Sequence, residues 1–262
     1  MHFLKRLKNY FLILFYRGLY WFKFLPGRLS YTQIKLPDFI IIGAPKCGST
    51  FLFETLNTHP QIKGASLKEP QYFNLNYKRG ERYYRGFFPL KKDGFFTGEA
   101  SVNYFYSTEA AKRIKQDLPQ VKLILLLRNP VDRAYSHFQM NKGNLKQKDF
   151  NQLIESENAE NKRFGFVEKG NYAKYLENWI TLFSKDQLLI LKSEALFKDP
   201  QLEMQKVLQH IGVQSHDFEN LKAINSRKYS KIDVESSKKL KAYYRKDGEK
   251  LVNLLGEKFK WN

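Results

Sequence analysis

Residues 38–57 restrict the possible folds of this chain more than any other stretch. Four apolar residues (39–42) predict a buried strand, and the pattern over residues 49–57 predicts a helix. The turn between them contains Gly43 and Gly48. This order of strand, glycine turn and helix start directs several backbone N–H groups toward one position. It therefore predicts a phosphate-binding site.

The spacing of Gly43 and Gly48 is that of a Walker A loop, but the residue that follows differs. A Walker A loop has Lys directly after the second Gly, where it reaches the β- and γ-phosphates, and then Ser or Thr for magnesium. Here Ser49 follows Gly48, and the lysine lies inside the loop at Lys46. The loop therefore predicts a phosphate cradle for a ligand other than ATP with magnesium. An ordinary strand–turn–helix corner with an incidental lysine stays open as the alternative.

A second apolar run, residues 121–127, predicts a central parallel strand that ends in Arg128. In a P-loop nucleotide hydrolase such a strand ends in an Asp that helps to hold magnesium. An arginine fits a second phosphate better than a metal ion, because it offers a planar pair of donors. Ser136 follows across a predicted strand-to-helix turn, so both side chains can face one phosphate. The predicted ligand is a nucleotide with phosphates at two places, and no metal is required.

The overall charge narrows the class of partner. A net charge of +19 indicates an anionic partner, which can be a nucleotide, an acidic glycan, nucleic acid or lipid headgroups. The single cysteine, Cys47, excludes an internal disulfide, and no Asn-x-Ser/Thr sequon occurs. Both features favour a cytoplasmic location. One cysteine and five scattered histidines do not favour a zinc site.

The first 35 residues differ in character from the rest of the chain. They are basic and aromatic, and no acidic residue occurs before Asp38. Their longest uncharged apolar run, residues 10–16, is far shorter than the roughly 20 residues of a membrane span. A helix lying in a membrane interface is therefore expected over residues 1–35, with peripheral contact at the cytoplasmic membrane face through residues 3–25. Packing of this helix on its own domain stays open.

Strands and helices alternate over residues 38–215, which predicts a central parallel sheet with helices on both faces. Asp233 is typical of an N-cap and predicts a closing helix after it. Pro70 predicts an extended conformation for Glu69, in a loop or at a strand end. The basic, aromatic stretch of residues 77–88, which contains Arg79 and Arg82, is interpreted either as a solvated helix face or as a wall that binds an anionic acceptor.

These motifs resemble the sulfotransferase superfamily, which uses 3′-phosphoadenosine 5′-phosphosulfate (PAPS). Residues 43–50 resemble the family's 5′-phosphosulfate loop, and residues 127–136 resemble its 3′-phosphate motif. The heparan-sulfate-type branch and its bacterial relatives are most similar, through residues 68–73, 98–101 and 170–172. The resemblance implies a P-loop-NTPase-like three-layer sandwich of α/β class, with the sulfotransferase domain over residues 36–262.

The resemblance also implies roles for individual residues. Lys46 is expected to bind the 5′-phosphosulfate and to stabilise the leaving phosphate. Glu69 is expected to be the general base for the acceptor hydroxyl. Lys68, beside it, is expected to steady the sulfuryl group or an acidic acceptor. The further cofactor contacts are expected from Cys47, Gly48, Ser49, Thr50, Arg128, Ser136, Tyr172, Arg227 and Lys228. Tyr172 and the loop around Arg227 would close over the nucleotide.

The implied activity is in-line transfer of a sulfuryl group from PAPS to a hydroxyl of a carbohydrate or glycolipid. Two departures from the family pattern concern the acceptor and the nucleotide loop. Ala100 stands where glycosaminoglycan enzymes usually have Lys, and Asn225-Ser226-Arg227 replaces their Lys-Gly-Arg loop. His137 stays open as an alternative base.

Two other functions compete with this one. A P-loop-type small-molecule kinase is disfavoured by Lys46, Ser49 and Arg128. A non-catalytic basic module that binds membrane or nucleic acid is compatible with the charge, but it does not require Glu69 beside a phosphate loop. No nucleic-acid partner is expected.

Overall fold

The fold is built on a parallel sheet of four strands. The structure is a computed structural model that describes residues 31–155, 159–219, 221 and 230–261. The strands are β1 (Phe39–Gly43), β2 (Gly98–Ala100), β3 (Lys122–Leu127) and β4 (Leu188–Lys192), in the order β2-β1-β3-β4. Every neighbouring pair is parallel, and all five residues of β1 are buried. The predicted central parallel sheet is confirmed.

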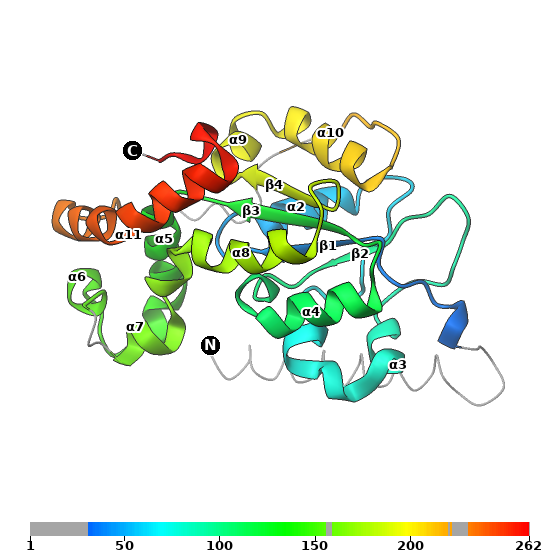
Figure 1. Ribbon diagram of the computed structural model, residues 1–262, viewed down its shortest axis with the longest axis horizontal. Coiled ribbons are helices and arrows are strands. Elements are labelled where there is room, and N and C mark those ends of the chain that lie inside the picture. Colours follow the sequence, from blue (N-terminus) through cyan, green and yellow to red (C-terminus); the bar gives the residue numbers. More distant parts are fainter. Residues whose placement is uncertain (1–30, 156–158, 220, 222–229, 262) are drawn as a thin grey trace.

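Helices cover both faces of this sheet, as Figure 1 shows. One face carries α2 (Ser49–Leu56), α9 (Ser193–Lys198) and α10 (Pro200–Ile211), and the other carries α4 (Thr108–Asp117) and α8 (Tyr172–Leu182). The structure also describes α3 (Gly80–Arg85), α5 (Pro130–Asn141), α6 (Phe150–Leu153), α7 (Ala159–Phe164) and α11 (Val234–Leu255). The predicted three-layer α/β sandwich is therefore confirmed.

Capping side chains fix where several helices begin. Ser107, Asn129, Asp149, Asp199 and Asp233 each accept a hydrogen bond from a backbone N–H in the first turn of the helix that follows. Such a cap is typically worth about 1 kcal/mol. α2 differs, because its N-cap is Gly48 and no side chain caps it. The first N–H groups of α2 are therefore not occupied by a capping side chain.

Most of the predicted N-terminal helix lies outside the described residues. Membrane contact through residues 3–25, the cytoplasmic location and the boundary near residue 35 therefore stay predictions. The described chain begins with a 3-10 turn at Tyr31–Gln33, and Ile34 then bridges to Leu90. No helix in the described part of the chain combines the length and the hydropathy that a membrane crossing requires.

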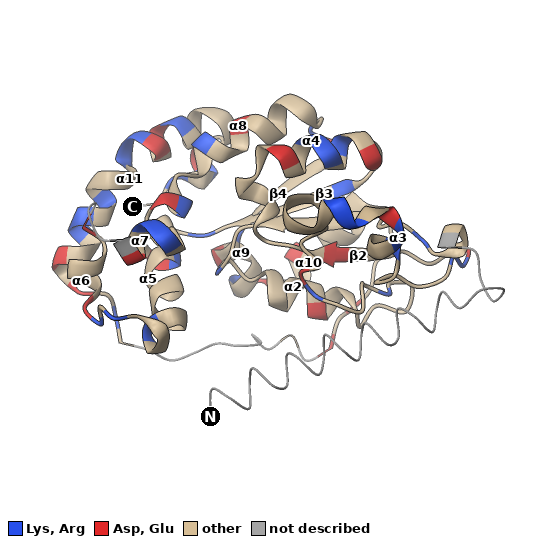
Figure 2. Cartoon of the chain, turned by 90° about the horizontal axis from the view of Figure 1, so that it is seen from below, with Lys and Arg blue, Asp and Glu red and all other residues tan. Residues whose placement is uncertain are grey.

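Basic and acidic side chains are mixed on the long surface helices. Figure 2 shows Lys and Arg beside Asp and Glu on α4 and on α11. Lys112 pairs with Glu109 at 3.2 Å on α4, and Lys239 pairs with Glu235 at 3.1 Å on α11. Exposed pairs of this kind contribute less than about 1 kcal/mol each.

Candidate active site

The predicted phosphate loop lies at the carboxyl end of β1. The Ala44 N–H donates to the Leu126 carbonyl at 2.8 Å, which ties the loop to β3. Gly48 has a φ of 98°, and a Cβ there would lie 3.0 Å from an aromatic ring, so glycine fits with least strain. Ser49 and Thr50 follow in the first turn of α2. The loop and the uncapped helix start form a backbone cradle suited to phosphate.

Arg128, directly after β3, reaches over this loop. Its Nη1 donates to the Lys46 carbonyl at 3.4 Å. The Lys46 Nζ in turn donates to the Met140 sulfur of α5 at 3.4 Å. The structure thus brings the Arg128 guanidinium onto the backbone of the loop that carries Lys46, at the carboxyl edge of the sheet.

The side chains of Cys47 and Tyr172 are both buried beneath the loop, and the predicted cofactor contacts of these two residues stay predictions. Cys47 is fully buried, and Tyr172 is 1% exposed. The Tyr172 hydroxyl donates to the Arg128 carbonyl at 3.0 Å and lies 3.9 Å from the Cys47 sulfur. Burial raises the pKa of the Cys47 thiol to about 11, so the thiol stays protonated and unreactive. Tyr172 thus supports the backbone at Arg128, the residue predicted to bind the 3′-phosphate.

The backbone at Glu69 adopts an uncommon conformation. The non-glycine residues with positive φ in the described part of the chain are Lys46 (72°), Glu69 (64°) and Gln71 (50°). The extended conformation predicted from Pro70 is therefore wrong, because tertiary contacts override the local preference. Such residues cost on the order of 1–3 kcal/mol each and concentrate at functional sites. The strain singles out the Lys46 and Glu69 segments as one candidate site.

Both carboxylate oxygens of Glu69 are held by neighbours. The Lys68 Nζ donates to Oε1 at 3.2 Å, and the Gln71 amide donates to Oε2 at 2.8 Å. Gln71 is fixed in turn, since its backbone N–H donates to the Ser101 hydroxyl at 3.1 Å and the Asn74 amide donates to its side-chain oxygen at 2.8 Å. The Glu69 side chain is still 32% exposed. Glu69 is thus oriented and accessible, as a general base must be.

A buried carboxyl, Glu99 on β2, supports this arrangement from the core. Its Oε1 accepts hydrogen bonds from the Tyr84 hydroxyl at 2.8 Å and the Tyr104 hydroxyl at 2.9 Å, and its Oε2 accepts one from Ser101 at 2.6 Å. Burial raises the pKa of Glu99 to about 7, although the three hydroxyl donors oppose the rise. Ser101 therefore links Glu99 to Gln71, and through Gln71 to Glu69.

The raised pKa of Glu99 predicts a pH dependence of folding stability. In the folded protein Glu99 keeps its proton up to about pH 7, whereas in the unfolded chain it loses the proton near the ordinary glutamate pKa of 4.5. The folded state therefore binds more protons between these values, and the free energy of unfolding falls as pH rises through this window, by on the order of 3 kcal/mol. Glu99→Gln, which cannot ionise, is expected to flatten this slope in urea unfolding between about pH 5 and pH 8. The exposed Glu109→Gln is the control and should keep the slope; an unchanged slope in Glu99→Gln would contradict the assignment.

Charges of the Lys46 and Glu69 segments act on two partly or largely buried groups, His137 and Lys169. The pKa of His137 is lowered to about 3, first by burial and then by the charges of Arg133, Lys169 and Lys46. The pKa of Lys169 is lowered by burial and Arg133, while the charge of Glu69 opposes this change. Charges that act on one another in this way lie within a short distance. His137 is a weak proton acceptor at neutral pH, which favours Glu69 as the base.

Ser136 lies in the second turn of α5 and is 6% exposed. Arg227 and Lys228 lie outside the described residues, so their contacts stay predictions. The chain that follows them is anchored to the same helix, because the Tyr135 hydroxyl lies 3.1 Å from the Ser230 hydroxyl. This contact brings the segment that follows the basic loop to the helix that carries Ser136.

The predicted acceptor wall at Arg79 and Arg82 stays a prediction, and the position of this segment does not favour it. The Tyr77 hydroxyl donates at 3.2 Å to Asp117, which ends α4 just before β3 begins. This segment therefore lies at the amino-terminal edge of the sheet, and Figure 1 shows α3 far from α5. Arg79 lies 4.2 Å from the centre of the Tyr83 ring, a contact that serves local packing. The structure supports the interpretation of a solvated helix face.

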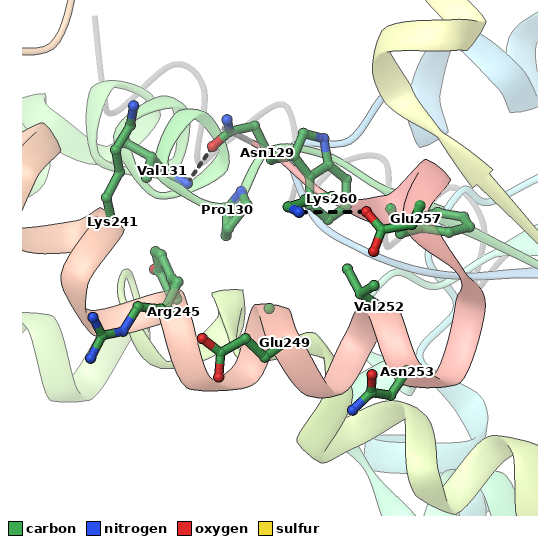
Figure 3. Close-up of a pocket in the computed structure, with 14 residues that line it drawn as sticks. Asn129, Pro130, Val131, Lys241, Arg245, Glu249, Val252, Asn253, Glu257 and Lys260 are labelled. Atoms are coloured by element: carbon green, nitrogen blue, oxygen red, sulfur yellow. Dashed lines mark hydrogen bonds and ion pairs between the residues drawn. The ribbon is translucent and has the colours of Figure 1, made fainter.

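A cavity of about 400 Å³ borders the site on the side of α11, as Figure 3 shows. Its wall includes Asn129 and Pro130 at the start of α5, Arg245 and Glu249 of α11, and Lys260. None of Lys46, Glu69 and Ser136 lines it. The cavity adjoins the residue after Arg128 but is not where the predicted reacting groups converge.

The comparisons with known proteins agree with this geometry. The sulfotransferase domain family matches residues 36–252. The chain belongs to the sulfotransferase family. The resemblance inferred from the motifs is confirmed.

Two curated human relatives give the extent of the similarity. Heparan sulfate glucosamine 3-O-sulfotransferase 3B1 is 29% identical over 259 residues, with 87% of this chain and 65% of that protein covered. Bifunctional heparan sulfate N-deacetylase/N-sulfotransferase 3 is 32% identical over 261 residues, with 84% of this chain and 30% of that protein covered. The chain thus spans less than two thirds of the length of these relatives.

A solved structure shares the fold. The sulfotransferase from Alicyclobacillus acidocaldarius has a TM-score of 0.75 at 23% identity, over 85% of this chain and 96% of that chain. At this identity the likeness shows the fold alone. The chemistry depends on the individual residues of the site.

Four residues that build the site were not predicted from the sequence: Gln71, Glu99, Ser101 and Lys169. Glu99 and Ser101 lie in a segment that resembles the family, but spacing alone does not reveal their burial or their hydroxyl contacts. For the other two residues the only available signal was proximity in the sequence. Gln71 lies two residues after Glu69, and Lys169 lies three residues before Tyr172.

Proposed function

We propose that this chain is a PAPS-dependent sulfotransferase that transfers a sulfuryl group to a hydroxyl of an acceptor, a carbohydrate or a glycolipid. The observation that carries the proposal is the meeting of Lys46 and Arg128 on an uncapped phosphate loop. Glu69 is oriented on both carboxylate oxygens, by Lys68 and by Gln71. Membership of the sulfotransferase family supports the reaction class.

The residues present fit a nucleotide with two phosphate groups. The start of α2 and Lys46 would hold the 5′ group, and Arg128 and Ser136 would hold the 3′-phosphate. The buried Arg133 adds positive charge, and its Nε and Nη1 have no hydrogen-bond partner in the described part of the chain. An anionic ligand offsets this excess of donors and charge. PAPS, when bound, supplies the activated sulfuryl group.

Each residue of the site then has a defined task. Glu69 takes the proton of the acceptor hydroxyl, which is typically worth about 10²–10⁴-fold in rate. Lys46 and the first N–H groups of α2 stabilise the charge that develops on the leaving phosphate. Lys68 donates to Glu69 at 3.2 Å and would steady the sulfuryl group or an acidic acceptor. In the described residues no group of three or more His, Cys, Asp and Glu could hold a metal; independence from metal stays a prediction.

The acceptor class rests on the relatives and on the residues around Glu69. The human relatives are named for heparan sulfate, which supports a carbohydrate acceptor. Ala100, which stands where glycosaminoglycan enzymes usually have Lys, is fully buried and offers the acceptor no charge. We therefore propose a hydroxyl-bearing glycan or glycolipid as the acceptor and assign no particular sulfated position.

Nucleotide binding tests this proposal without an acceptor. Adenosine 3′,5′-bisphosphate is expected to raise the melting temperature of the protein, because it binds the folded state, whereas ATP with magnesium is expected to have little effect. Arg128→Ala should weaken binding of the bisphosphate by about 10–100-fold, since a charged hydrogen-bonding pair is lost. Arg79→Ala, at the opposite edge of the sheet, is the matched control and should bind normally. A shift with ATP and magnesium alone would contradict the proposal.

A further inference from the structure

Met140 is an exposed methionine whose sulfur contacts the cation of the phosphate loop. It lies in the last turn of α5, and its side chain is 44% exposed. The Lys46 Nζ donates to the Met140 sulfur at 3.4 Å. The backbone of Lys46 is held by the loop, because Arg128 donates to its carbonyl at 3.4 Å. The reaction proposed above gives the Met140 sulfur no role.

Among the sulfur-containing residues that the structure describes, Met140 is the one exposed to solvent. Met204 on α10 and Cys47 in the loop are both fully buried. Burial also raises the pKa of the Cys47 thiol to about 11, and oxidants attack the thiolate in preference to the thiol. Met1, the third methionine of the chain, lies outside the described residues. An oxidant in solution is therefore expected to reach Met140 before Met204 or Cys47.

Oxidation of Met140 would strengthen its contact with Lys46. A thioether sulfur is only a weak hydrogen-bond acceptor. Conversion to the sulfoxide makes the side chain polar and adds an oxygen atom. An ammonium that donates to an oxygen forms a strong, charge-assisted hydrogen bond. Such a bond would draw the Lys46 ammonium toward α5 and compete with a phosphate for it.

We propose that Met140 is a modification site, at which oxidation by a peroxide lowers the affinity of the loop for the nucleotide. The proposal rests on the proposed function, in which Lys46 holds the 5′ group. With hydrogen peroxide the O–O bond breaks, one oxygen forms a bond to the Met140 sulfur, and the other leaves as water with both protons. The sulfur is oxidised from thioether to sulfoxide, and the peroxide is reduced. Methionine sulfoxide reductases reverse this change, so the loss of affinity is reversible.

Peptide mass mapping and nucleotide binding after treatment with hydrogen peroxide test this proposal. Met140 should gain one oxygen atom before Met204 does. The affinity for adenosine 3′,5′-bisphosphate should then fall by about 10-fold, the usual value for one charged hydrogen bond, and methionine sulfoxide reductase should restore it. Met140→Leu should keep after treatment the affinity that it had before. Met204→Leu, which retains Met140, is the matched control and should lose as much affinity as the wild type.

Met140→Gln tests the same contact without an oxidant. Its amide oxygen stands in for the sulfoxide oxygen beside Lys46, whereas Met140→Leu offers no acceptor. Met140→Gln should therefore bind the bisphosphate about 10-fold more weakly than Met140→Leu does. Both variants should unfold at wild-type urea concentrations, because the side chain that they replace is exposed.

The outcomes separate this proposal from the function on which it rests. Equal losses of affinity in the wild type and in Met140→Leu after treatment would overturn the proposal and leave the nucleotide assignment intact. Full affinity of a protein whose Met140 carries the added oxygen, or oxidation of Met204 ahead of Met140, would do the same. An untreated wild-type protein that binds no bisphosphate would contradict the proposed function itself, and this proposal with it.

Discussion

Replacing Lys46 with alanine is expected to lower kcat for sulfuryl transfer by about 10²–10³-fold, the usual loss when one preorganised donor to a developing charge is removed. The lysine lies in the loop that also receives Arg128, with Met140 as a neighbour. Its loss removes the positive charge nearest the leaving phosphate. Initial rates with PAPS at saturating acceptor measure the effect.

The control for Lys46→Ala is Lys112→Ala. Lys112 is exposed on α4 and pairs only locally with Glu109 at 3.2 Å. It should keep the wild-type rate. Both variants should unfold at similar urea concentrations, since Lys46→Ala keeps the strained φ of 72° and removes no core contact. A Lys46→Ala protein that is folded and transfers at the wild-type rate would contradict the role of the loop.

Glu69→Gln is expected to lower kcat by about 10²–10⁴-fold while adenosine 3′,5′-bisphosphate still binds with wild-type affinity. Glutamine has the same shape and keeps a hydrogen bond to its neighbours, but it cannot accept the hydroxyl proton. The loss should therefore appear in kcat, with little change in nucleotide affinity. Single-turnover rates, combined with the thermal shift from the bisphosphate, separate the two effects.

Glu109→Gln, on the exposed face of α4, is the matched control for this substitution. It changes an exposed carboxylate, paired only with Lys112, to an amide and should leave kcat unaltered. If Glu69→Gln lost nucleotide binding and folding stability together with activity, Glu69 would be a structural residue. If it kept full activity, another group would have to be the base.

The fold could be predicted because its signals are local. The apolar runs at residues 39–42 and 121–127 predict β1 and β3, and the residues after each run form the loop and Arg128. The carboxyl edge at which Lys46 and Arg128 meet then follows from parallel topology. Asp233 caps α11, as its residue type and place predicted.

Other features of the candidate site could not be predicted from the sequence, because burial and side-chain direction depend on tertiary packing. Tyr172 starts a helix near the loop, but its ring turns into the core below Arg128. Arg79 and Arg82 are basic and close to Glu69 in sequence, but the intervening turns carry them to the opposite edge of the sheet. The pKa of Glu99 is raised by its burial, and no spacing rule predicts that this carboxyl lies in the core.

The measurement that tests the central claim most directly is product analysis after incubation with PAPS and a panel of glycans, including heparan sulfate and its desulfated form. We expect that a glycan gains a sulfate ester, that an equal amount of adenosine 3′,5′-bisphosphate is released, and that Glu69→Gln forms neither product. Phosphoryl transfer from ATP with magnesium, with no sulfate ester formed from PAPS, would contradict the assigned reaction.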